Sequence, residues 1–160
     1  YCLISWGNFK GDRNLGLRDR LLTLQKCLVR IACGAGRISH ADPLFAKMAT
    51  LKVDDLFEQS VRIFSYKMSR GMMPSGMTTL LGKADHGYQT RGARSTFFVE
   101  RSGCRSIKSI APKCWNPLPR ELKTLPSVTA FKERSKLDLL APYGSFVCSV
   151  RDCRSCTGLV

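Results

Sequence analysis

Residues 52–71, KVDDLFEQSVRIFSYKMSRG, decide the fold class of this chain, because they carry its clearest helical pattern. Aspartates stand in the first turn of this stretch and basic residues in its last, the signs that the helix dipole favours at each end. Gly71 follows as a helix stop. One face of the predicted helix is apolar and contains Val53, Phe57, Val61, Phe64 and Met68. We therefore expect a mainly α fold.

A second helix is predicted over residues 14–33, upstream of the first. Its apolar residues recur at alternating steps of four and three, at Leu17, Leu21, Leu24, Leu28 and Ile31. We expect this seam to pack against the rest of the fold. The basic residues in and next to this stretch fall largely off the seam and are expected to face solvent, where they can bind phosphate; they are Arg13, Arg18, Arg20, Lys26 and Arg30. Gly34 is predicted to end the helix.

Two further helices are predicted. Asp42 followed by Pro43 has the order of an N-cap and a first helical residue. Near the C-terminus, Ser127 is expected to cap an amphipathic helix that Pro142 and Gly144 end. The apolar face of this last helix is predicted to contain Val128, Phe131, Leu137 and Leu140.

The stretch from residue 83 to 113 differs in character, because helical spacing gives way to glycine, serine and basic residues. Two short β-prone runs, residues 96–100 and 105–110, are separated by Ser102 and Gly103 and predict a β-hairpin. The expected fold is a mainly α helical bundle with a small β-hairpin element and an irregular C-terminal tail. The predicted regions are 1–82, helical; 83–141, the basic loop or hairpin, a connector and the final helix; and 142–160, a cysteine-containing tail.

The net charge of +14, from 26 basic and 12 acidic residues, points to a polyanionic partner. We favour RNA and DNA over an acidic lipid surface or an acidic protein. No run of about 18 apolar residues occurs in the sequence, so we expect no membrane-spanning helix. The basic residues fall mainly in two blocks, on either side of a nearly neutral centre, and we expect both blocks to converge on one groove.

In the second block, cations alternate with Tyr88, Phe97, Phe98 and Trp115, a mixture that can follow a phosphate backbone and stack on bases. We interpret Phe97, Phe98 and Trp115 as core residues, which leaves the cations as the functional groups. The predicted nucleic-acid-binding residues are Lys26, Arg30, Arg91, Arg94, Arg101, Arg105, Lys108 and Lys113.

The eight cysteines fit free thiols in a reducing compartment better than a disulfide framework, because the apolar runs can form a core without cross-links. We therefore expect an intracellular location, in the nucleus and the cytoplasm. The tail spacing C-x4-C-x2-C would suit zinc if Cys104, His86 or a residue beyond Val160 gave a fourth ligand. The three thiols of that site are Cys148, Cys153 and Cys156. The alternative is a tail with free thiols.

No catalytic residue is predicted. His40 and His86 are the only histidines, and a hydrolase that uses one of them stays an alternative, although no nucleophile elbow accompanies them. The glycine pattern GAGRIS at residues 34–39 lacks the strand and the spacing of a phosphate-binding loop, so we interpret it as helix termination.

Several segments occur in a characteristic order: YCLISWGN (1–8), LQKCLVRIACG (24–34), HADPLFAKMATLKVDDLFEQSVRIFSYKMSRGMMP (40–74), HGYQTRGA (86–93) and RSIKSIAPKCWNPLPRELKTLPSVTAFKERSK (105–136). This order resembles the region after the polymerase core in reverse transcriptases of non-LTR retrotransposons, the jockey, CR1 and L2-like elements. The most specific part is W-N-x-L-P followed by a helix that contains Phe131 and Lys132.

The resemblance implies an RNA-directed DNA polymerase that copies element RNA at a nicked chromosomal end. Its magnesium-binding aspartates would belong to a palm upstream of Tyr1, so the chain is expected to be a fragment, the end of the thumb and the C-terminal extension. Its implied partners are the template and primer strands and the upstream polymerase core. The W-N-x-L-P piece is expected to be a rigid connector with structural anchors at Trp115, Asn116, Leu118 and Pro119.

Departures from the family pattern leave two further interpretations open. Cys2, Cys27 and Cys114 stand where the resemblance leads us to expect glycine, arginine and leucine. One alternative is therefore an inert remnant of a decayed element. The other is a small basic zinc-binding or protein-interaction module.

Overall fold

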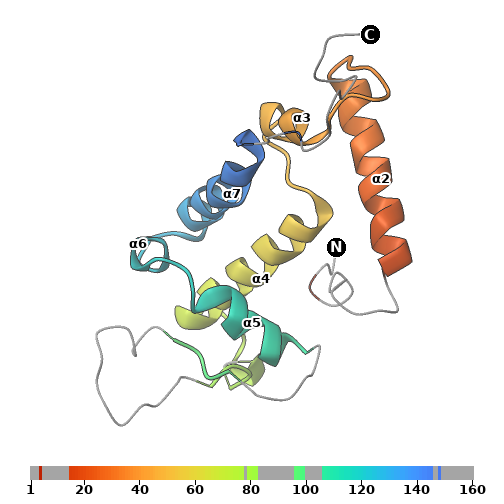
Figure 1. Ribbon diagram of the computed structural model, residues 1–160. Coiled ribbons are helices and arrows are strands. Elements are labelled where there is room, and N and C mark those ends of the chain that lie inside the picture. The colour runs from red at the N-terminus through yellow and green to blue at the C-terminus, as the bar shows by residue number, and fades with distance from the viewer. Residues whose placement is uncertain are drawn as a thin grey trace. The chain divides into compact units, whose positions relative to one another are not determined.

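The computed structural model describes residues 4, 15–77, 79–82, 96–99, 106–145 and 148 (Figure 1). These residues are mainly helical, as predicted. The elements are α2 (Leu15–Ala32), α3 (Asp42–Lys47), α4 (Val53–Ser69), the 3-10 turn η2 (Ser75–Met77), α5 (Ile107–Trp115), α6 (Arg120–Lys123) and α7 (Val128–Gly144).

The chain divides into two compact units. The first consists of Tyr1–Asn8 and Phe57–Ser135, and the second of Phe9–Leu56 and Lys136–Val160. Each unit is thus built from two separated stretches of sequence, and the division falls inside α4 and inside α7. This division differs from the three consecutive regions expected from the sequence.

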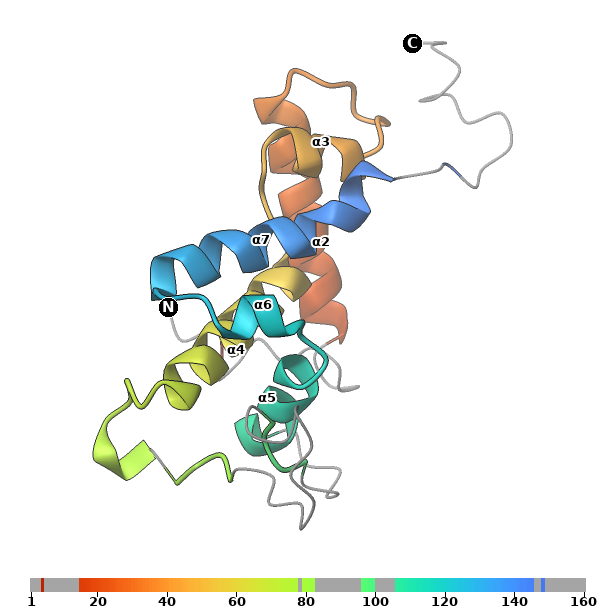
Figure 2. The ribbon, with the colours of Figure 1, turned by 90° about the vertical axis from the view of Figure 1, so that its left-hand side faces the viewer.

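The core of the first unit is aromatic and lies among α4, the short helix α6 that follows α5, and the beginning of α7 (Figure 2). Tyr66 and Phe131 are both fully buried, and their rings stack with centroids 4.5 Å apart. Trp115, at 1% exposed, lies 6.1 Å from the Phe131 ring and 5.9 Å from the Phe97 ring. Each such buried aromatic stabilises the unit by roughly 1.5–3 kcal/mol, so this cluster dominates its packing.

The core of the second unit is smaller and joins the ends of α2, α3 and α7. Its buried members are Val29, Ala41, Phe45 and Tyr143. The rings of Phe45 and Tyr143 meet edge to face, with centroids 6.2 Å apart. The Tyr143 hydroxyl accepts a hydrogen bond from the Lys52 N–H at 3.0 Å and donates one to the Asp55 carboxylate. This polar tip holds the last turn of α7 against the first turn of α4.

The predicted helix starts and stops are confirmed at three positions and are wrong at two. Gly34 and Gly71 both have positive φ, at 63° and 66°, and so end α2 and α4 as predicted. Ser127 caps α7, since its Oγ accepts a hydrogen bond from the Ala130 N–H at 3.1 Å. Asp42, however, is the first residue of α3 and forms no side-chain cap, because Ala41 takes the cap position. Pro142 lies inside the last turn of α7 and does not end it.

The predicted β-hairpin is wrong. Residues 107–110 of its second run belong to α5, and no strand forms among the described residues. Ile107 and Ile110 pack against the core of the first unit together with Ala111 and Trp115, at a spacing that only a helix brings to one side. Tertiary packing therefore overrides the β-propensity of the isoleucines. From the first run, the Phe98 N–H donates one hydrogen bond to the Gly82 carbonyl, at 2.8 Å.

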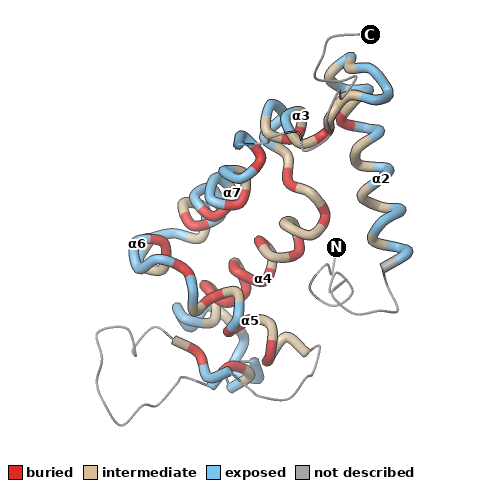
Figure 3. The backbone as a smooth tube through the Cα atoms, in the orientation of Figure 1, coloured by how far each residue is buried: buried red, intermediate tan, exposed pale blue. Residues whose placement is uncertain are grey.

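The predicted packing face of α2 is also wrong (Figure 3). Four of the five residues of the predicted seam are exposed. The exposed fraction is 53% for Leu17, 60% for Leu24, 64% for Leu28 and 76% for Ile31. The opposite side faces the core of the second unit, where Val29 is buried. Polar contacts fix this orientation: Arg18 binds Asp54, and the Val53 N–H donates to Gln25 Oε1 at 2.9 Å.

The buried face of α7 follows steps of four. Phe131, Ser135, Leu139 and Tyr143 are buried, whereas Leu137, which was expected on this face, is 58% exposed. Val128 and Leu140, also predicted on this face, are partly buried against the two cores, so the prediction is wrong only at Leu137, and it lacks Ser135, Leu139 and Tyr143.

No membrane-spanning helix is found in the part of the chain that the structure describes. Even α2, at 18 residues, carries several charges along its length. The expectation of no such span holds for these helices.

Candidate nucleic-acid interface

The predicted nucleic-acid-binding residues are only partly described by the structure. Lys26 and Arg30 lie on α2 in the second unit, and Lys108 and Lys113 lie on α5 in the first unit. The remaining four lie outside the described residues, namely Arg91, Arg94, Arg101 and Arg105. Convergence of the two basic blocks on one groove therefore stays a prediction.

Lys26 and Arg30 are one helical turn apart on α2 and are both half-buried. The Arg30 Nε donates a hydrogen bond to the Ser39 carbonyl at 2.8 Å. This contact fixes the plane of the guanidinium and ties the loop after α2 back against the helix. Neither cation is paired with a carboxylate within the described stretches. Like charges at this spacing repel each other, so an anion between them would be stabilising.

A hollow of about 250 Å³ opens beside these two cations. One wall is α2 and the other is the turn that leads into α3. The residues that line it are Lys26, Arg30, Ile38, Ser39, His40, Ala41 and Asp42. The basic, concave character of this place could not be read from the sequence, because it depends on the loop folding back onto α2.

The carboxylate of Asp42 does not cancel the positive charge of the hollow. It already pairs with Lys52, whose Nζ lies 2.9 Å from Asp42 Oδ2. Lys52 is also held over the Tyr143 ring, at 4.6 Å from its centroid. The acidic residue at the wall is therefore neutralised from outside, which leaves the charges of Lys26 and Arg30 in excess there.

Lys108 and Lys113 are both exposed on α5. At about 100° per residue they lie roughly 140° apart around the helix axis, so they do not form one tight cluster. The sides of α5 that they leave free are occupied by buried residues, among them Ser109, Ala111 and Trp115. The two lysines can contact a polyanion from α5, each at a separate phosphate.

Other cations of the described residues serve the fold. Arg18 binds Asp54 with two nitrogens, and the Asp54 contact raises the pKa of Arg18. Arg62 pairs with Glu58 at 2.7 Å. Arg70 lies over the Tyr66 ring and Lys123 over the Trp115 ring, and both donate hydrogen bonds to backbone carbonyls. Burial lowers the pKa of Lys123. We therefore assign these four no role toward a ligand.

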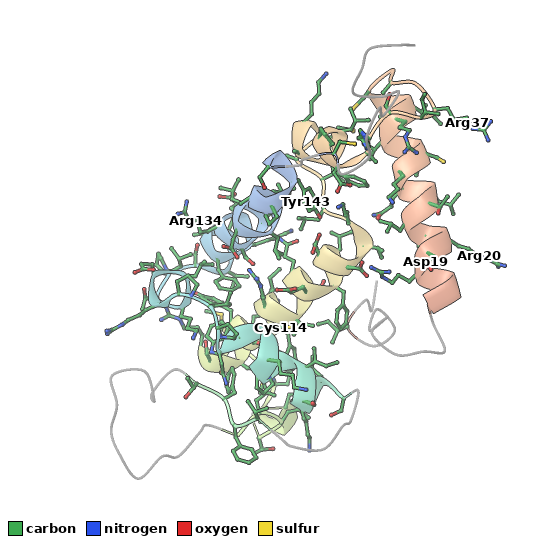
Figure 4. The ribbon with its side chains drawn as sticks, viewed as in Figure 1. Asp19, Arg20, Arg37, Cys114, Arg134 and Tyr143 are labelled. Carbon is green, nitrogen blue, oxygen red and sulfur yellow. The ribbon has the colours of Figure 1, made fainter. Side chains whose placement is uncertain are left out.

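Several exposed cations lie outside the set of predicted binding residues. In Figure 4 the side chains of Arg20, Arg37 and Arg134 extend away from the ribbon. Arg120 and Lys132 are exposed as well. None of these five forms a side-chain hydrogen bond or ion pair within the described residues. Their only signal in the sequence is the charge itself, which they share with the cations that pair internally.

The four predicted anchors form a well-packed corner of the first unit. Trp115 is 1% and Leu118 7% exposed. The Asn116 side chain makes two hydrogen bonds with the backbone of Phe97, at 3.0 and 2.9 Å. Pro119 takes the N-cap position of α6. Of the aromatics expected in the core, Phe97 is buried, but Phe98 is 61% exposed, which corrects that part of the prediction.

The proposed zinc ligands are mostly outside the described residues. Cys148 is half-buried, whereas Cys153, Cys156, Cys104 and His86 are not described. Among the described residues, no group of three histidine, cysteine or acidic side chains could hold a metal ion. The tail site thus stays a prediction. His40 lines the basic hollow, a place that suits an anion contact better than the hydrolytic role considered above.

Comparison with known proteins gives no further guide to this interface. No family model, no curated protein and no solved structure matches the chain.

Proposed function

We propose that this chain binds nucleic acid through the sugar-phosphate backbone, as the C-terminal part of an RNA-directed DNA polymerase of a non-LTR retrotransposon. The observation that supports this best is the hollow beside Lys26 and Arg30, where two cations that pair with no carboxylate of the described residues share one concave surface. The resemblance described above supplies the polymerase context. The chain itself would hold template and primer and would not carry out the chemistry.

The pattern of charges supports backbone contact over base recognition. Cations on two helices, half-buried on α2 and exposed on α5, suit phosphates, which repeat along a strand and carry no sequence information. Lys26 and Arg30 would contribute from the second unit, and Lys108 and Lys113 from the first. Binding is therefore expected with little sequence preference, to RNA and to RNA/DNA duplexes.

Charge reversal tests this proposal. Lys26→Glu with Arg30→Glu, and separately Lys108→Glu with Lys113→Glu, should each weaken binding of a labelled duplex about tenfold or more near 0.1 M salt. Lys47→Glu with Lys136→Glu is the matched control, because it makes the same change in net charge at two lysines of the second unit that lie outside the proposed interface. It should change affinity about threefold or less, as only the overall charge differs. Equal losses in all three variants would refute a localised interface.

A separate variant tests the predicted cations that lie outside the described residues. Arg94→Glu, Arg101→Glu and Arg105→Glu together should weaken duplex binding more than Lys47→Glu with Lys136→Glu does. An effect no larger than the control would remove these cations from the interface while leaving the α2 and α5 lysines in it.

A second candidate function, protein interaction, is favoured by the exposed stripe of α2. Leu17, Leu24, Leu28 and Ile31 are more than half exposed and, with Leu21, have the four-three spacing of a coiled-coil seam. Such a seam fits another amphipathic helix. The polymerase core that the resemblance implies is the expected source of that helix.

The stripe is tested with Leu24→Gln and Leu28→Gln. These changes should abolish binding of the chain to a separately produced polymerase core and leave duplex binding unchanged. Unaltered core binding would exclude the stripe as the contact. Formation of a dimer by the chain alone, lost in the same variant, would show that a second copy takes that place.

Zinc binding by the tail stays part of the alternative function. One zinc per purified chain, lost on Cys153→Ser with Cys156→Ser, is the expected result if the tail thiols form a site. Metal content that is unaffected by these changes would exclude them as ligands.

A further inference from the structure

We infer that the hollow beside Lys26 and Arg30 binds a phosphate monoester group, that is, a terminal phosphate rather than an internal phosphodiester. This deepens the proposed function by assigning a ligand class to one place within the interface. It rests on the proposed function only for the source of the phosphate, which would be the end of a nucleic-acid strand.

The arrangement of donors suits a compact dianion. The Arg30 Nε is occupied by the Ser39 carbonyl at 2.8 Å, so the guanidinium is held in one plane, and within the described part of the chain its two terminal nitrogens make no other hydrogen bond. A planar pair of N–H groups matches two oxygens of one phosphate. Lys26, one turn away on the same helix, adds a point charge that can reach the third oxygen.

The electrostatics favour the more highly charged form of phosphate. Asp42, the only acidic residue among the described residues that line the wall, is paired with Lys52 at 2.9 Å and does not oppose an anion. Lys26 and Arg30 have no carboxylate partner among the described residues, and their two charges match the double charge of a monoester, whereas an internal diester carries a single charge. The hollow therefore gains more from a strand end than from a passing backbone.

The volume of the hollow also favours a phosphate group as its ligand. A volume of about 250 Å³ lies below the range of about 300–1,000 Å³ that is usual for sites enclosing a whole small molecule. It has room for a phosphate and part of the attached sugar. Ile38, 54% exposed in the wall, offers an apolar surface to that sugar.

The test compares two single-stranded oligonucleotides that differ only in a 5′-phosphate or a 5′-hydroxyl, with inorganic phosphate as a third probe. The full chain should bind the phosphorylated strand about tenfold more tightly, the gain expected from one additional charge-assisted contact. Lys26→Met should abolish this preference, and the matched variant Lys47→Met should retain it. Since Arg30 also holds the loop, Arg30→Lys serves as the milder second variant and should reduce the preference.

This experiment separates failure of the monoester site from failure of the proposed nucleic-acid binding. Equal affinity of the unchanged chain for both strands and no response to inorganic phosphate would overturn the monoester site, even if salt-dependent backbone binding persists. A strand preference that survives Lys26→Met would overturn the location. Binding of inorganic phosphate, lost in Lys26→Met but without strand preference, would support the site and assign it to free phosphate instead of a strand end.

Discussion

The side chain of Asn116 pairs with the backbone of Phe97 in both directions. Its Oδ1 accepts from the Phe97 N–H at 3.0 Å, and its Nδ2 donates to the Phe97 carbonyl at 2.9 Å. An amide is the only ordinary side chain that offers a donor and an acceptor in this arrangement. The Asn of the W-N-x-L-P motif thus pairs with an extended segment in the way that the backbone of a neighbouring strand would, while the adjacent Trp115 lies buried in the core.

Asn116→Ala should lower the free energy of unfolding by about 1–3 kcal/mol, because it leaves two polar backbone groups of a buried residue without partners. Asn116→Asp should also destabilise the chain, since its second oxygen would face the Phe97 carbonyl. Urea unfolding measures both, with the exposed Thr129→Ala as control. An Asn116→Ala variant as stable as this control would refute the anchoring role.

The two faces of α2 give a direct test of its orientation. Leu24→Gln and Leu28→Gln alter residues that are 60% and 64% exposed, and each should change the unfolding free energy by about 0.5 kcal/mol or less. Val29→Ala, on the buried face, should cost about 1–2 kcal/mol. A reversed order, with the leucines costly and Val29 silent, would restore the packing face that the sequence predicted.

Ser135 offers a change that should stabilise the chain. Its hydroxyl is buried and has no hydrogen-bond partner among the described residues. Ser135→Ala removes this unpaired group and improves helix propensity, so the unfolding free energy should stay equal or rise by up to about 1 kcal/mol. The control is Ser65→Ala, because the Ser65 hydroxyl is bonded to the Val61 carbonyl at 2.9 Å. A clear loss of stability in Ser135→Ala alone would mean that its hydroxyl is paired after all.

Tyr143 should make the second unit sensitive to alkaline pH. Burial, and then the hydrogen bond to Asp55, raise the pKa of Tyr143 above its ordinary value of about 10. The folded state therefore holds this proton more tightly than the unfolded state does. The resulting stabilisation is complete below about pH 10 and is lost as the pH rises from there toward the higher folded pKa.

Tyr143→Phe cannot ionise and should show a shallower decline of stability between about pH 9 and pH 11 than the unchanged chain. At neutral pH the same variant should lose about 1 kcal/mol, since Lys52 N–H and Asp55 each lose a partner. Unfolding curves recorded across this pH range provide the comparison. Parallel declines in the two proteins would contradict the assignment to Tyr143.

Local signals predicted the helices well. The periodic apolar residues of α4, the glycines after α2 and α4 and the serine before α7 each act within a few residues, so their effect can be read along the chain. The orientation of α2 could not be read in this way. It depends on Arg18 meeting Asp54, 36 residues away, and on Gln25 meeting the Val53 backbone.

The same distinction applies to the candidate interface. The sequence identified Lys26, Arg30, Lys108 and Lys113 as cations available to a ligand, and none of them pairs with a carboxylate within the described residues. It could not separate them from Arg70 or Lys123, whose carbonyl and aromatic partners come from other segments. The hollow required the fold-back of the loop at Ser39 onto Arg30, which no local pattern reveals.

The salt dependence of nucleic-acid binding tests the central claim most directly. Fluorescence anisotropy of a labelled RNA/DNA duplex should give an association constant whose logarithm falls linearly with the logarithm of salt concentration. A slope of about −4 to −6 is predicted if five or six phosphates are neutralised. Two duplexes of unrelated sequence should give the same slope. A flat salt response would contradict the account, because cations that bind phosphates must release the counterions that those phosphates hold.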